Sequence, residues 1–161
     1  MAATNHQDVG IIGAGLIGCS IALRLAQQGL RVCVFDRGEP GAEASSAGAG
    51  MIAPQGETTE PDGFYELCAA SRDLYPEFVA EVEELSGERV GLRREGTLMV
   101  SLDETSCVEL GEVYDCQTRA GLAIDRLAPE EARRLAPQLS PQIRSAFFIA
   151  GDYCVDNEKL A

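Results

Sequence analysis

The fold of this chain is decided by the stretch Val9-Gly10-Ile11-Ile12-Gly13-Ala14-Gly15-Leu16-Ile17-Gly18. Its first four residues form a mostly apolar run, which predicts a short strand buried on both faces. The three later glycines have the Gly-x-Gly-x-x-Gly spacing of the turn that binds dinucleotides. Asp36 follows Gly18 after seventeen residues, where this motif carries an acidic residue that accepts hydrogen bonds from ribose hydroxyls. The stretch therefore predicts a Rossmann-like βαβ unit.

Each glycine of the turn has a separate physical role. Gly13 permits the tight turn out of the strand, and Gly15, without a Cβ, allows a pyrophosphate to approach the backbone. Gly18 allows the helix to pack closely on the strand, and the helix N-terminus offers free N–H groups to phosphates. The alternative is a glycine-rich turn without a ligand, which the agreement of so many elements disfavours.

The residues after the turn continue this pattern. Apolar residues at three- and four-residue steps predict an amphipathic helix that ends near Gly29: Ile17, Ile21, Ala22, Leu23, Leu25 and Ala26. Residues 31–35 predict a second strand. Asp36 favours a free 2′-hydroxyl, and so NAD or FAD over NADP. Arg37 could contact a 2′-phosphate, but beside Asp36 the simpler interpretation is that it covers adenine or phosphate, or is solvated.

Residues 38–55 consist largely of Gly, Ala and Ser. Such a segment can be a flexible linker. We favour contact with a ligand, because small residues allow the backbone to lie against a flat ring and the segment follows the phosphate turn. Ser45 and Ser46 could donate hydrogen bonds to phosphate, and residues 47–51 could present N–H groups to a second aromatic moiety.

The remaining elements are predicted by apolar periodicity and by capping residues. Residues 63–86 predict a long helix with one apolar face in the core, which Pro76 could kink or divide. Residues 92–102 predict a hairpin or a bent strand. Further expected elements are a helix over 103–120 capped by Asp103, a strand over 124–127, a helix over 129–135, a strand over 145–150 and a helix capped by Asp156.

Composition excludes several classes of partner. The 161 residues carry a formal charge of −13, which disfavours nucleic acids and anionic membranes. No segment is long and apolar enough for a membrane span, and the N-terminus lacks the features of a secretory signal. The six cysteines are scattered, so we expect reduced thiols in a cytoplasmic protein. His6 is the only histidine, and we predict no metal site and no His-based catalysis.

With these motifs in place, the chain resembles the D-amino-acid-oxidase-like family of FAD-dependent oxidoreductases, and within it looks most like the glycine oxidase branch. The resemblance spans nearly the whole chain. It rests on the glycine turn with Asp36, on Ser45-Ser46-Ala47-Gly48-Ala49-Gly50-Met51-Ile52-Ala53-Pro54-Gln55, on Arg94-Glu95-Gly96-Thr97-Leu98, on Leu127-x-Pro129-Glu130-Glu131-Ala132 and on Asp152-Tyr153-x-Val155-Asp156. One departure is Asp36 itself, where the family most often has Glu.

The resemblance implies FAD as the cofactor. Its contacts would be Gly13, Gly15, Leu16, Ile17 and Gly18 at the turn, Asp36 and Arg37 at adenosine, Ser45 and Ser46 near the pyrophosphate, and Ala49, Gly50 and Met51 along the flavin. It implies an α/β fold with a FAD-binding domain over 1–86, the first part of an α+β substrate-binding domain over 87–150, and a return to the FAD domain over 151–161.

The implied reaction is oxidation of the C–N bond of glycine or another small amine or amino acid, with O₂ as acceptor and H₂O₂ as product. The family holds the substrate carboxylate through residues of its C-terminal half, so no catalytic residue is assigned. We expect the chain to be the N-terminal portion of a longer protein, and we leave open a homo-oligomer of that protein. Alternatives within the enzyme class are a D-amino-acid dehydrogenase, a sarcosine-oxidase-like enzyme and a glycerol-3-phosphate dehydrogenase. The alternative outside it is a non-catalytic dinucleotide-binding module.

Overall fold

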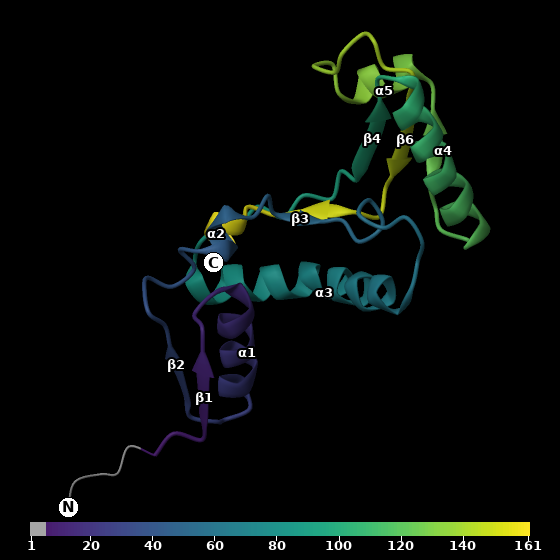
Figure 1. The fold of residues 1–161 in the computed structure, drawn as a ribbon. Helices are drawn as coiled ribbons and strands as arrows, with labels where there is room; N and C mark the ends of the chain where they lie inside the picture. The colour runs from purple at the N-terminus through teal and green to yellow at the C-terminus, as the bar shows by residue number, and fades with distance from the viewer. Residues whose placement is uncertain (1–5) are drawn as a thin grey trace, which may run out of the picture. The chain divides into compact units, whose positions relative to one another are not determined.

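The computed structural model describes residues 6–161, which divide into two compact units (Figure 1). The first unit comprises the described residues up to Gly50, together with Val82–Val90 and Asp156–Ala161. The second unit comprises Met51–Glu81 and Gly91–Val155. The fold class is the predicted α/β.

The first unit contains the predicted βαβ arrangement. Strand β1 (Val9–Ile12) leads into helix α1 (Leu16–Gln27) and then into β2 (Val32–Phe35). The two strands pair in parallel, from Val9 opposite Val32 to Ile12 opposite Phe35. Helix α1 lies alongside both strands, as a crossover connection requires (Figure 1).

The predicted burial of β1 on both faces is wrong. Ile12 is 93% exposed, and on α1 the side chain of Ile17 is 78% exposed. Within the described residues β1 pairs only with β2, and α1 is the only helix among the strongest packing partners of this sheet. The apolar residues of β1 and α1 are therefore present as predicted. Among the described residues, however, no further strand or helix of this sheet covers Ile12 and Ile17.

Residues 38–50 are structured and do not form a plain linker. They include the short helix α2 (Ala44–Ala47), which packs against α6 (Asn157–Leu160) in the same unit. The amide of Asn157 donates hydrogen bonds to the carbonyl oxygens of Ser45, at 2.8 Å, and Ser46, at 3.0 Å. Asp156 accepts a hydrogen bond from the N–H of Lys159, which confirms its prediction as an N-cap.

The second unit is built on an antiparallel sheet in the order β4-β6-β5. Its strands are β4 (Thr97–Ser101), β5 (Asp125–Leu127) and β6 (Ser145–Ile149). Residues 92–102 form neither a hairpin nor one bent strand: β4 is short, and Arg93 forms a separate bridge with Cys154. Gly96, at a φ of +84°, separates the two, and a Cβ there would lie 2.8 Å from the ring of Phe148.

Two predicted helices pack on this sheet. Helix α5 (Pro129–Leu135) contributes Ala132 to an apolar core with Ile143 and Ala146. Helix α4 (Glu104–Arg119) stacks Tyr114 on Phe147, with ring centroids 4.9 Å apart. The predicted N-cap of α4 is confirmed, because the Asp103 carboxylate accepts a hydrogen bond from the Ser106 N–H at 2.9 Å.

Helix α3 (Gly63–Ser86) is a single helix of 24 residues, so Pro76 does not divide it. Its predicted apolar face is only partly buried: Tyr75 and Phe78 are half-buried, whereas Phe64 and Leu74 are 72% and 65% exposed. The buried residue of the helix, Val79, was not among the residues predicted for this face. The helical period was therefore correct, but most of this face lacks a covering element among the described residues.

A buried polar network holds residues 55–58 in the second unit. The amide groups of Gln55 and Gln117 bond to each other at 3.1 Å, and Gln117 also donates to the carbonyl of Thr58. The buried Asp152 carboxylate accepts the backbone N–H groups of Gln55 and Gly56. The second unit also pairs β3 (Met51–Ile52) with β7 (Tyr153–Cys154).

All six cysteines carry free thiols. Over residues 6–161, no helix combines the length and apolarity that crossing a membrane requires.

Candidate dinucleotide-binding site

The glycine turn has the backbone that its sequence predicts. Gly13 adopts a φ of +104°, which favours glycine, and its N–H donates to the carbonyl of Phe35 at 2.7 Å. A Cβ on Gly18 would overlap the carbonyl oxygen of Gly13, so only glycine allows α1 to pack this closely. The turn therefore links the ends of β1 and β2 and exposes the N-terminus of α1.

Gly15 is the N-cap residue of α1 and has an ordinary extended backbone, with φ −80° and ψ 179°. Its lack of a side chain matters for space, not for conformation. A Cβ at this position would lie 3.0 Å from the hydroxyl oxygen of Ser45. This close approach to Ser45 was not predicted, since Ser45 lies 29 positions after its partner Leu16 in the sequence.

Ser45 completes the N-terminus of α1. Its hydroxyl oxygen accepts the Leu16 N–H at 2.9 Å, so it serves the helix as a capping acceptor from a distant loop. The hydroxyl proton remains able to donate to a ligand. Ser46 instead donates its hydroxyl to the carbonyl of Glu43 at 3.0 Å, and Ile17 points largely into solvent.

Asp36 is held against the glycine turn. One carboxylate oxygen accepts the Ala14 N–H at 2.7 Å, and the other accepts the Gly38 N–H at 2.9 Å. These two backbone hydrogen bonds lower the pKa of Asp36, so the carboxylate is ionised at neutral pH. Each oxygen keeps a lone pair for a further donor such as a ribose hydroxyl. The sequence predicted the ligand role of Asp36 but not this structural one.

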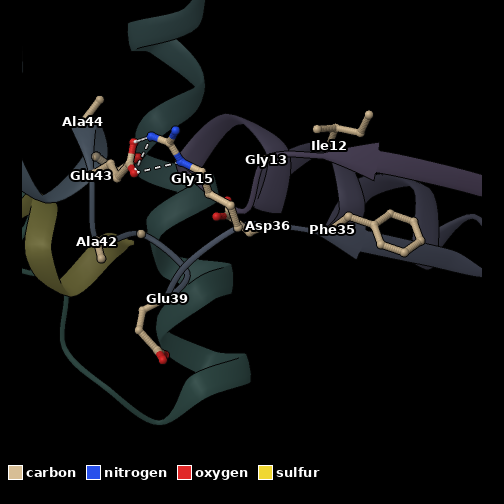
Figure 2. A pocket seen from close by; sticks show the side chains of 12 residues that line it. Ile12, Gly13, Gly15, Phe35, Asp36, Glu39, Ala42, Glu43 and Ala44 are labelled. Carbon is tan, nitrogen blue, oxygen red and sulfur yellow. Dashed lines mark hydrogen bonds and ion pairs between the residues drawn. The ribbon is translucent and has the colours of Figure 1, made fainter.

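Gly13, Gly15, Asp36 and Ser45 are among the residues that line a cavity of about 550 Å³ within the first unit (Figure 2). The predicted site residues in its lining are Gly13, Gly15, Asp36, Arg37 and Ser45. Further lining residues were not predicted individually: Ile12, Phe35, Glu39, Gly41, Ala42, Glu43 and Ala44. Ile12 and Phe35 are the last residues of two parallel strands, and ligands bind outside the carboxyl ends of such strands. Their position at the strand ends could therefore have predicted them as lining residues.

Arg37 forms an ion pair with Glu43 at this cavity. The two guanidinium contacts to the carboxylate measure 2.7 Å and 2.8 Å from Nη2, and a third from Nε measures 3.2 Å (dashed lines in Figure 2). The side chains are 82% and 70% exposed. Sequence reasoning considered adenine, phosphate and solvent as partners of Arg37, and missed Glu43.

The other predicted contacts are not part of this cavity lining. Ala49 and Gly50 end the first of the segments that make up the first unit, with Gly50 at a φ of +71°. Leu16 and Ser46 are next to lining residues in sequence, and Ile17 and Gly18 follow in the first turn of α1. Met51 belongs to the second unit, where it begins β3 and is 51% exposed.

The cavity fits the adenosine and pyrophosphate end of a dinucleotide. A phosphate would meet the N-terminus of α1 beside Gly15. Apart from the neighbouring residues in the chain, no atom lies within 4 Å of the place where a Gly13 side chain would begin. Asp36 supplies an ionised acceptor, and Phe35, 59% exposed, offers an apolar ring.

Comparison with known proteins gives one family. The family model described as "DAO: FAD dependent oxidoreductase" matches residues 8–161. Glycine oxidase of Geobacillus kaustophilus is 33% identical over 98% of this chain, and the bifunctional protein ThiO/ThiG of Synechocystis is 45% identical over 95% of it. The chain spans 42% of that glycine oxidase and 22% of that bifunctional protein.

Solved structures agree with these matches. The crystal structure of glycine oxidase from Geobacillus kaustophilus superposes with a TM-score of 0.90 at 32% identity, over 96% of this chain and 42% of that one. Iminodiacetate oxidase from Chelativorans gives a TM-score of 0.75 at 33% identity, over 94% of this chain and 42% of that one.

Proposed function

This chain belongs to the DAO family of FAD-dependent oxidoreductases, and we propose that it is the N-terminal portion of an oxidase that converts glycine and O₂ into an imine and H₂O₂. The expectation of FAD as the cofactor is confirmed by the family. The observation that carries the proposal is the similarity to glycine oxidase over 98% of the chain, which includes every residue of the cavity at the glycine turn. Three relatives named ThiO/ThiG support a place in thiamine biosynthesis.

We assign the adenosine and pyrophosphate end of FAD to the first unit. Gly13, Gly15 and Gly18 would form the phosphate turn, with Leu16 and Ile17 at the start of the helix beside it. Asp36 would accept the ribose hydroxyls, and Arg37 would lie over the adenosine. The open Gly13, the exposed helix N-terminus and the ionised Asp36 support these roles.

Five further residues complete the proposed contacts. Ser45 and Ser46 would lie near the pyrophosphate. The bond from the Leu16 N–H uses a lone pair of the Ser45 hydroxyl, so the hydroxyl proton can still be donated to a ligand. Ala49, Gly50 and Met51 would follow the flavin. When bound, FAD supplies the acceptor for the two electrons of C–N oxidation. The residues of this chain bind the cofactor and fix its register, and we assign none of them to the reacting substrate.

We propose that residues 1–86 belong to the FAD-binding domain, 87–150 to the first part of a substrate-binding domain, and 151–161 to the return into the FAD domain. The pairing of α6 with α2 supports a return of the chain to the cofactor side. We further propose a cytoplasmic protein that takes a small amine or amino acid, with O₂ as electron acceptor. A homo-oligomer of the full-length protein belongs to the same proposal.

A second candidate substrate is an N-substituted glycine, because iminodiacetate oxidase is as similar in sequence as glycine oxidase is. The test is H₂O₂ production by the purified full-length protein with glycine, sarcosine, iminodiacetate and D-alanine. We expect the highest kcat/KM with glycine. H₂O₂ only from iminodiacetate or sarcosine would favour the second candidate, and none from any amine, in a flavin-loaded protein, would contradict an oxidase.

A further inference from the structure

We propose that Glu43 sets the ligand specificity of this cavity by holding Arg37 and thereby disfavouring dinucleotides whose adenosine ribose carries a 2′-phosphate. The inference rests on the proposed FAD site, and it adds a positioning residue that the glycine motif does not include. Two features of the structure support this role of Glu43: the Arg37–Glu43 ion pair and the net negative charge of the cavity lining.

The ion pair occupies the hydrogen-bonding fork of Arg37. Nη2 contacts both oxygens of the Glu43 carboxylate, at 2.7 and 2.8 Å, and Nε adds a contact of 3.2 Å. The same planar fork is what recognises a phosphate bidentately. An arginine next to the acidic residue of the second strand is the group that accommodates a 2′-phosphate in NADP-binding sites. Glu43 therefore competes with a 2′-phosphate for the same donors.

The charges around the cavity act in the same direction. Its charged lining residues are Asp36, Arg37, Glu39 and Glu43, a net formal charge of −2. Asp36 is fixed as a carboxylate by the N–H groups of Ala14 and Gly38, and it suits a ribose with both hydroxyls free. A phosphate dianion at this end would meet three carboxylates and one arginine that is already paired.

Exposure limits the size of the effect. Both partners are more than two thirds exposed, and exposed ion pairs are screened and individually weak. Removal of Glu43 frees the donors of Arg37 and also removes one negative charge. We therefore expect a change in preference of about three- to tenfold, not a complete switch.

The test compares 5′-AMP with adenosine 2′,5′-bisphosphate, which differ only in the 2′-phosphate, as competitors of FAD. The full-length protein is freed of flavin, and FAD uptake is followed by quenching of flavin fluorescence. Wild type should prefer 5′-AMP. Glu43→Gln should shift the ratio of the two inhibition constants toward the bisphosphate by about three- to tenfold.

Two variants separate the ion pair from general repulsion. Glu39→Gln removes the same charge from the same lining, but among the described residues Glu39 forms no ion pair with Arg37, so it should shift the ratio about twofold or less. Arg37→Gln added to Glu43→Gln should abolish the gain. Thermal unfolding checks that each variant is folded.

Equal shifts in Glu43→Gln and Glu39→Gln, or a gain that persists without Arg37, would overturn the role of Glu43 while the FAD site stands. A wild-type apoprotein that binds FAD but is not inhibited by 5′-AMP would overturn the placement of adenosine at this cavity. Failure of wild type to take up FAD would overturn the proposed function and this inference together.

Discussion

Replacing Gly15 by valine separates the space in the glycine turn from its conformation. Gly15 has φ −80° and ψ 179°, a region open to every L-residue, so the substitution does not strain the backbone. The new Cβ would lie 3.0 Å from the Ser45 hydroxyl oxygen, and the branched side chain would enter the cavity that both residues line. The change therefore acts on a ligand at the helix N-terminus more than on the fold.

The size of the effect follows from the contacts that a phosphate would lose. A hydrogen bond between a backbone N–H and a charged group contributes about 1.5–3 kcal/mol. Loss of one such bond raises the Kd for FAD about 10- to 150-fold, and loss of two raises it about 10²- to 10⁴-fold.

The assay is fluorescence titration of FAD into the apoprotein form of the full-length protein. Gly38→Val is the matched control, because a Cβ there meets nothing within 4 Å and Gly38 does not line the cavity. A Kd for Gly15→Val within about twofold of the Gly38→Val value would refute a phosphate site at this turn.

Three further predictions concern stability. Ser45→Ala leaves the Leu16 N–H without its acceptor and should lower the free energy of unfolding by about 1 kcal/mol in urea titrations; an unchanged midpoint would contradict the capping role. Hydrogen bonds from Arg31 lower the pKa of Asp8 from 3.8 to about 2, so its stabilising contribution is complete above 3.8 and disappears as pH falls toward 2. The difference in Tm between wild type and Asp8→Asn should shrink over that interval; a constant difference would count against the ion pair. Burial raises the pKa of Asp152, so the stability that wild type gains from this group is greatest below 3.8 and declines as pH rises through the folded pKa. Asp152→Asn should lower the free energy of unfolding by about 1–3 kcal/mol, and the loss should be largest in acid. Urea unfolding at several pH values measures this loss, and a larger loss at neutral pH than in acid would contradict the prediction.

Local signals explain which elements were predictable. The glycine turn, the Asp103 and Asp156 caps and the proline at the start of α5 each act within a few residues, and the structure has the corresponding helix and strand starts. Periodicity also predicted the length of α3. It could not predict what covers an apolar face, and so Ile12 and Phe64 were expected to be buried and are exposed.

Contacts across the chain were the part of the candidate site that sequence could not supply. Ser45 reaches Leu16 across 29 positions, and Glu43 meets Arg37, six positions earlier, within the loop after β2. The buried pair of Gln55 and Gln117 joins residues 62 positions apart. Serine, glutamate and glutamine are common residues whose types alone do not predict a partner. Only their proximity in the folded chain shows which groups they bond to.

The most direct test of the central claim is the absorption spectrum of the purified full-length protein before and after anaerobic addition of glycine. We expect a yellow protein with stoichiometric FAD, whose flavin absorbance is bleached by glycine and restored by O₂. A colourless, folded protein that takes up NAD instead would contradict the assignment of the glycine turn to FAD, and a flavin that glycine does not bleach would contradict the proposed reaction.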